Sequence, residues 1–360
     1  MMRTKKVLPV LCTLGIALLG MGILADSTAV AQGIRDGLGV CGNVLVPSLF
    51  PFMALAGYVS RTDFARLLSL PLAPVTTRVF KLPAELGAVV LLSLVGGYPV
   101  GARMISDLLA EGRIQRKTAQ RMLCFCVNSG PSFLVSAVGV GMLMDRRAGV
   151  ILLGSQILAT LLVGAVVSLR AKEPPGMKPR AAKTGGTAAF VSAVSGASSS
   201  MLVMCAFAVL FSAGLSLLRS SGVVEALAEA LSLREAVVSA VLGGLLEVTS
   251  GCLNAVKVGG LPGFGLLCAA VSFGGLSVIC QVMSCFEGQE MGFRGYLLSR
   301  GAHAAIAAAV AVPLYSAFCG ERSVLAAAYP PVMHSDGKTW IISVCLMAMC
   351  SILVMNIGKK

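Results

Sequence analysis

Two polar clusters interrupt apolar stretches of the sequence, at 128–131 and 272–275, and both carry small hydrogen-bonding residues. Pro131 removes one helix hydrogen bond, and paired glycines at 274–275 favour a break in the second stretch. A broken helix leaves backbone N–H groups unpaired, so each cluster could bind a polar or anionic solute. With a third break at 96–99, these clusters supply the candidate substrate-binding residues: Gly97, Tyr98, Asn128, Ser129, Gly130, Ser272, Gly274, Gly275 and Gln281.

Glu247 is the only carboxylate in the middle of a long apolar stretch, and Thr249 and Ser250 follow it. Ionisable residues inside a membrane are costly and usually face a cavity or a partner. We therefore consider these three residues candidates for proton or cation coupling or for gating. The alternative is a structural Glu247 paired with a neighbouring hydroxyl. His303 is interpreted as a packed or hydrogen-bonded residue rather than a proton relay.

The composition indicates a membrane protein and argues against an enzyme. Hydrophobic residues make up 56% of the 360 residues, charged residues 12%, and the mean hydropathy is +0.88. No Walker loop, GxSxG or HExxH motif occurs, and the twelve cysteines form no CxxC pair, so no cofactor or metal is expected. The basic residues responsible for the net charge of +13 lie between the apolar stretches, where the positive-inside bias places them. They form no continuous basic helix of the kind that binds nucleic acid.

Apolar stretches long enough to cross a bilayer (~17–25 residues) predict an all-α, polytopic protein of about eight transmembrane helices. The predicted spans are 7–25, 38–60, 122–144, 148–169, 201–218, 264–285, 297–318 and 338–357. The first resembles a signal peptide, but its apolar run is long for one, so we prefer an uncleaved helix.

Charge decides the nature of two further apolar stretches, 84–110 and 237–257. Basic segments flank the first on both sides, and a full crossing would place one of them outside, against the positive-inside bias. A re-entrant hairpin removes the conflict, and 237–257 is treated likewise. The rival prediction is ten ordinary helices. The hairpin topology places both termini in the cytoplasm.

The order of interruptions repeats along the chain, which predicts two repeats. Each consists of a broken stretch, a broken span and a complete span, at 84–169 and 237–318. Because the two hairpins enter from opposite faces, the repeats are inverted, an arrangement typical of transporters with a binding site near the midplane. The remaining segments are N-terminal helices (1–60), an inner-surface segment (61–83), a basic cytoplasmic loop (170–186), an interfacial segment with connecting span and external loop (187–236), and an external loop with a C-terminal helix (319–360).

Three motifs together resemble the sporulation integral membrane protein family of the SpoVV/YlbJ type. They are Gly96-Gly97-Tyr98-Pro99-Val100-Gly101-Ala102, Asn128-Ser129-Gly130-Pro131-Ser132-Phe133, and Ser272-Phe273-Gly274-Gly275-Leu276-Ser277-Val278 with Gln281. The resemblance covers roughly residues 38–320. It implies a nucleoside recognition (gate) domain, an architecture like that of concentrative nucleoside transporters, and a role in endospore formation in a membrane around the forespore.

We therefore expect a membrane transporter of a small anionic aromatic solute. The resemblance implies dipicolinate, and a nucleoside is the alternative. A non-transporting membrane scaffold or ligand-sensing gate protein is the rival from another class. Expected partners are the substrate, the lipid bilayer and a coupling proton or cation. A homo-oligomer is an open possibility, and no nucleic acid is expected.

Overall fold

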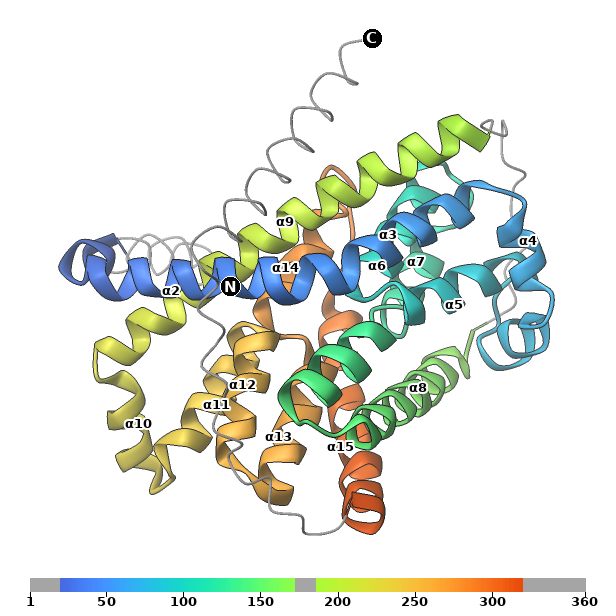
Figure 1. Cartoon of the computed structure of the whole chain (residues 1–360). Coiled ribbons are helices and arrows are strands. Elements are labelled where there is room, and N and C mark those ends of the chain that lie inside the picture. Colours follow the sequence, from blue (N-terminus) through green and yellow to red (C-terminus); the bar gives the residue numbers. More distant parts are fainter. Residues whose placement is uncertain (1–19, 172–185, 320–360) are drawn as a thin grey trace, which may run out of the picture.

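The computed structural model of the protein describes residues 20–171 and 186–319, and this part of the chain is built from helices without strands. Most of the predicted span 7–25, all of 338–357, the external loop after 319 and most of the basic loop lie outside the described residues. Figure 1 shows the described helices packed into one assembly.

Five helices of the described part are long and apolar enough to cross a membrane, which confirms an all-α, polytopic membrane protein. The first is continuous from Ser27 to Arg61, through α2 (Ser27–Val40), a π-helical turn (Cys41–Leu45) and α3 (Val46–Arg61). It therefore begins earlier than the predicted span 38–60. The others are α8 (Arg146–Ser168), α9 (Gly186–Ser220), α13 (Gly260–Phe273) with α14 (Gly275–Ser284), and α15 (Arg294–Cys319).

Helix α9 packs along α2 and α3 and stands apart from α8, α13 and α15 (Figure 1). Residues 187–200, for which the sequence left an interfacial helix open, extend the span 201–218 as part of α9. Close packing against α2 depends on small residues: a Cβ on Gly33 would lie 2.7 Å from the Cα of Ala213. Small residues bring helix backbones together in membranes in this way.

The stretch 84–110 folds as a helical hairpin, α5 (Gly87–Val95) and α6 (Tyr98–Ala110). Gly97 turns the chain with φ +84°, a conformation that L side chains rarely adopt, and Pro99 follows in the first turn of α6, where no intrahelical N–H is needed. With nine and thirteen residues, the arms are only about 14 and 20 Å long, well short of a bilayer core of about 30 Å.

The stretch 237–257 folds in the same way, as α11 (Glu235–Leu246) and α12 (Val248–Val258) joined at Glu247. The arms are antiparallel, since later residues of α12 meet earlier residues of α11. Gly251 packs directly on Gly244, and Asn254 Nδ2 donates to the carbonyl of Ser239 at 3.3 Å. These arms are also too short to cross a membrane, as the re-entrant interpretation requires.

A broken helix follows each hairpin. After the first come α7 (Arg116–Leu123), a non-helical stretch 124–130 and the π-helical segment η4 (Ser132–Met142). After the second come α13 and α14, separated at Gly274, where φ is +87°. The predicted interruptions at 128–131 and 272–275 are thus present, but 122–144 is two short helical pieces rather than one span.

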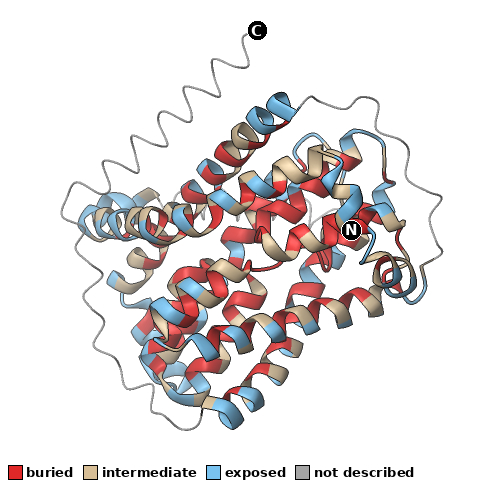
Figure 2. Cartoon of the chain, turned by 45° about the vertical axis from the view of Figure 1, so that its right-hand side comes forward, coloured by how far each residue is buried: buried red, intermediate tan, exposed pale blue. Residues whose placement is uncertain are grey.

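The order of hairpin, broken helix and long helix occurs twice, ending in α8 and in α15, which pack on each other. Buried residues gather where these elements meet, and the outward-facing sides of the helices are exposed (Figure 2). Shorter helices complete the described fold: α4 (Phe64–Ser69), a π-helical turn (Val75–Val79), a 3-10 turn (Ala84–Leu86) and α10 (Val223–Leu231). The membrane face that each hairpin enters stays a prediction.

Candidate functional site

The first hairpin and both helix breaks meet at one group of hydrogen bonds. The hydroxyl of Tyr98, at the tip of the first hairpin, donates to the carbonyl of Val271 in the last turn of α13. Ser129, in the first break, donates to the Tyr98 hydroxyl oxygen and also lies 3.2 Å from the Val271 carbonyl. These bonds join residues more than 140 positions apart in sequence. We call this meeting point of Tyr98, Ser129 and Val271 the centre.

Each hairpin tip also packs against the helix break of its own repeat. A Cβ added to Gly130 would lie 2.9 Å from the carbonyl oxygen of Val95, beside Gly97. A Cβ added to Gly275 would lie 3.1 Å from the carbonyl oxygen of Gly244, beside Glu247. The predicted glycines therefore allow backbone to approach backbone, and Gly97, Gly274 and Gly275 also adopt positive φ.

The two long helices each donate hydrogen bonds to the broken helix of the other repeat. Gln156 on α8 donates to the hydroxyl of Ser272, which itself donates to the Cys268 carbonyl at 2.7 Å. Arg300 on α15 donates to the carbonyls of Val127 and Cys124, the latter at 3.1 Å. These reciprocal contacts connect the two repeats.

Arg300 is the residue that the sequence prediction missed. Its side chain is fully buried and lies 5.7 Å from the ring centroid of Tyr296. No carboxylate of the described residues lies within 4 Å of it. The sequence placed it near the start of a span, where arginines usually reach the interface. The sequence did contain one signal: His303 follows Arg300 by three residues, which places both polar side chains on the same face of an apolar helix.

A second buried network lies next to Arg300. The hydroxyl of Thr160 on α8 donates to Asn128 Oδ1 at 2.9 Å and lies 3.1 Å from Nε2 of His303. The Asn128 amide donates to the Phe125 carbonyl at 2.8 Å. His303 is thus a buried, hydrogen-bonded residue, and Asn128 is held by the protein itself.

Glu247 forms the N-terminal cap of α12, the second arm of its hairpin. Its two carboxylate oxygens accept hydrogen bonds from the backbone N–H groups of Thr249, at 2.9 Å, and Ser250, at 2.7 Å. Only 2% of the residue is exposed. Thr249 therefore pairs through its backbone rather than through the hydroxyl that the sequence suggested, and its hydroxyl is buried without a partner among the described residues.

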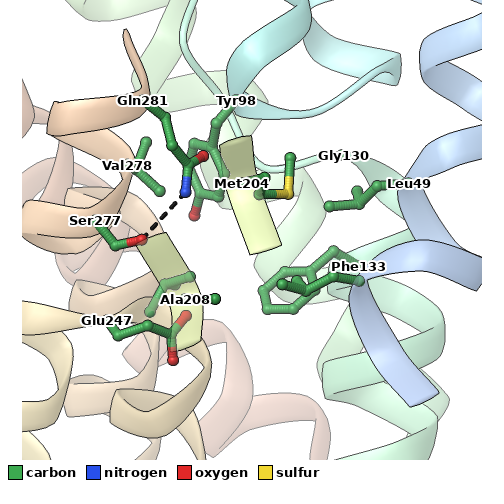
Figure 3. Close-up of a pocket in the computed structure, with 12 residues that line it drawn as sticks. Leu49, Tyr98, Gly130, Phe133, Met204, Ala208, Glu247, Ser277, Val278 and Gln281 are labelled. Atoms are coloured by element: carbon green, nitrogen blue, oxygen red, sulfur yellow. Dashed lines mark hydrogen bonds between the residues drawn. The ribbon is translucent and has the colours of Figure 1, made fainter. Parts of the chain in front are cut away.

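A small pocket of about 20 Å³, enough for a water molecule and partly open to the outside, adjoins this centre, so an organic solute could enter only if the surrounding helices move apart. Glu247, Ser277 and Gln281 lie on one side, and Leu49 and Phe133 face them across the gap (Figure 3). Gln281 donates to Ser277 at 3.1 Å. The complete lining is Leu45, Leu49, Tyr98, Gly130, Phe133, Met204, Ala208, Glu247, Val248, Ser277, Val278 and Gln281.

The structure brings four of the predicted binding and coupling residues to the pocket: Tyr98, Gly130, Glu247 and Gln281. The others do not line it. Asn128, Ser129 and Ser272 belong to the hydrogen-bond networks behind it, Gly97, Gly274 and Gly275 shape the breaks, and Thr249 and Ser250 cap Glu247. Apolar walls with a few polar groups are typical of sites for small organic molecules.

Comparison with known proteins identifies a distant relative. The chain is similar to the sporulation integral membrane protein YlbJ of Bacillus subtilis (strain 168), with 29% identity over 142 residues. The matched region is 39% of this chain and 35% of the relative, so the chain spans about a third of the curated protein that it matches. No family model and no solved structure matches. Together with the apolar helices, this similarity supports a relation to the sporulation integral membrane proteins and a multi-pass membrane protein.

Proposed function

We propose that the protein is a membrane transporter for a small aromatic solute that binds in the pocket between the two repeats. The observation that carries the proposal is the mixed origin of the pocket. Tyr98 and Gly130 come from the first repeat, and Glu247 and Gln281 come from the second. Movement of one repeat against the other would open or close such a pocket, as alternating access requires.

Dipicolinate is the leading substrate. Its flat ring suits the apolar walls once the repeats move apart, and both the motif resemblance and the similarity to a sporulation integral membrane protein point to sporulation. Its two carboxylates would meet Glu247, so binding requires that Glu247 be protonated or bridged by a cation. This requirement makes Glu247 the proposed coupling residue. The proposed location is a membrane around the forespore, with both termini in the cytoplasm.

A nucleoside is the second candidate, and the polar groups of the pocket favour it. A carboxylate at Glu247, an amide at Gln281 and a hydroxyl at Ser277 are suitable partners for a neutral base or sugar and create no charge repulsion. The apolar walls of the pocket thus support dipicolinate, and its polar groups support a nucleoside.

The test is the thermal stability of the full-length purified protein with dipicolinate, isophthalate, uridine or adenosine. A ligand that binds only the folded state stabilises it by RT ln(1 + [L]/Kd). We expect dipicolinate to raise Tm more than isophthalate, which lacks the ring nitrogen. Gln281→Leu should weaken this response. Gln289→Leu is the control, since Gln289 lies outside the pocket and bonds Ser106 at 2.8 Å.

Flux into proteoliposomes separates a transporter from a scaffold. Uptake of the stabilising solute supports the proposal, and a nucleoside response would change the substrate but not the function. Stabilisation without flux would favour the ligand-sensing gate protein. No response to any of these solutes would contradict the proposed function.

A further inference from the structure

Two helices of the centre, α7 and α13, end inside the protein, and a helix end leaves carbonyl groups without intrahelical partners. These carbonyls carry partial negative charge. In the last turn of α13, Ala270 O accepts from Gly274 N at 2.9 Å, and Val271 O accepts from Tyr98. The next carbonyl, of Ser272, accepts from Arg300 Nη1 at 3.4 Å.

The Arg300 guanidinium also donates hydrogen bonds at the end of α7. Its Nη2 donates to the carbonyl of Cys124, the residue that caps α7, at 3.1 Å, and Nη1 donates to Val127 in the first break. One cation is therefore placed where the carbonyl ends of the two broken helices converge, in contact with both repeats.

Nothing else in the described part of the chain neutralises this charge. Arg300 is fully buried, and its Nε has no hydrogen-bond partner. Glu247, the buried carboxylate of the pocket, is already paired with two backbone N–H groups. A buried charge is costly unless it is paired and hydrogen-bonded, so the carbonyl ends are its electrostatic partners.

Backbone carbonyls at interrupted helices are the groups that bind coupling cations in broken-helix transporters. We propose that the guanidinium of Arg300 is a resident cation that fills such a carbonyl site and joins the two repeats there, so that the protein needs no metal ion at this position. This inference deepens the proposed function, because the cation at the ends of α7 and α13 is then a side chain of the protein itself. It concerns the protein without solute and does not depend on which solute binds.

Chemical rescue of Arg300→Ala in the full-length protein tests the inference. The variant leaves three carbonyls without their donor, and we expect Tm to fall by at least about 5 °C. Low-millimolar guanidinium chloride should raise the Tm of this variant above its value in equimolar choline chloride, a cation too large for the site. The parent protein should show equal Tm in sodium chloride and choline chloride.

Arg121→Ala is the matched control, because Arg121 is a half-buried arginine that donates to one backbone carbonyl, of Lys81, at 2.9 Å. Its Tm should not respond to guanidinium. Recovery of Arg300→Ala by guanidinium or sodium, but not by choline or urea, supports a cation site. No recovery, equal recovery by urea, or the same rise in Arg121→Ala overturns it.

Arg300→Lys and Arg300→Gln keep the inference testable if the alanine variant does not fold. Lysine retains the charge, whereas glutamine retains donors without it, so the lysine variant should have the higher Tm. A glutamine variant that equals or exceeds the lysine variant would overturn the inference. Failure of the proposed function would instead appear as absent solute binding in the parent, which none of these measurements uses.

Discussion

Glu247 combines two roles. As the cap of α12 it accepts hydrogen bonds from two backbone N–H groups. As a pocket residue facing a dianionic solute, it would need a proton or a cation. The proposed coupling follows from the second role, because like charges repel and a dianionic solute beside Glu247 would bind together with a proton or a cation.

Replacing Glu247 with Gln tests both roles. Gln has one acceptor oxygen, and its amide N–H would oppose one of the backbone donors, so we expect a loss of about 1–3 kcal/mol in the free energy of unfolding. If Glu247 couples transport, flux should also fall while the protein remains folded and inserted. Flux equal to that of the parent would contradict the coupling role.

Asp145→Asn is the matched control for Glu247→Gln. Asp145 caps α8 and accepts from Arg147 N at 2.8 Å at an exposed position. Asn and Asp are about equally good caps, so this variant should keep the stability and flux of the parent.

Tyr98 gives a second prediction at this scale. Tyr98→Phe removes the donor to Val271 and the acceptor of the Ser129 hydroxyl, and should cost about 1–3 kcal/mol in the free energy of unfolding. Tyr296→Phe provides the comparison, since the buried Tyr296 hydroxyl has no partner among the described residues. Its removal should be neutral or stabilising in the same denaturation measurement. Equal losses in both variants would show that the Tyr98 hydrogen bonds contribute nothing specific.

At the scale of elements, the packing of the hairpins depends on glycines that lie in direct contact with the backbone of a neighbouring segment. A Cβ on Gly101 of α6 would lie 1.8 Å from the carbonyl oxygen of Cys126, in the first break. The hairpin and the broken helix therefore pack without a side chain between them. This close contact places Tyr98 within reach of Val271.

Gly101→Ala should therefore separate the first hairpin from the broken helix. We expect a loss of at least about 2 kcal/mol in the free energy of unfolding, because backbone must shift, and a loss of any solute-dependent rise in Tm. Gly154→Ala on α8 is the control, with nothing within 4 Å of the added Cβ. It should be neutral or stabilising by up to about 1 kcal/mol. A Gly101→Ala protein as stable as the parent would contradict this packing.

At the scale of the whole molecule, the two short hairpins of the described part of the chain predict a specific membrane topology. If each hairpin is re-entrant, the segments that flank it lie on the same face of the membrane. Arg66 and Arg116, both exposed, flank the first hairpin, and the exposed Glu229 and Lys257 lie before the second hairpin and in the last turn of its second arm.

Accessibility labelling checks this topology with one cysteine at a time in a background without the twelve native cysteines. Arg66→Cys and Arg116→Cys should be labelled from the cytoplasmic face by a membrane-impermeant maleimide. Glu229→Cys and Lys257→Cys should be labelled from the opposite face. Labelling of positions 66 and 116 from different faces would contradict the first hairpin, and the same holds for 229 and 257 in the second.

The sequence predicts both the class of protein and the positions of the helix interruptions. Both depend on local properties: apolar length decides whether a helix can cross a bilayer, and Gly97, Pro131 and Gly274 interrupt helices through their own backbone preferences. Its errors were also local, at the continuous helix from Ser27 to Arg61 and in the separate pieces of 122–144. There, packing decided where helices begin and end.

The contacts of the candidate residues, in contrast, depend on the tertiary structure. It turned Tyr98 towards Val271, placed Asn128 beside Thr160 and His303, and brought Gln281 to the pocket of Glu247. It also showed that Arg300, to which the sequence analysis gave no role, is fully buried and donates to both broken helices. The physical reason is distance along the chain: these contacts join residues that lie far apart in sequence, Tyr98 and Val271 even in separate repeats, and no local pattern specifies which carbonyl ends will converge around one guanidinium.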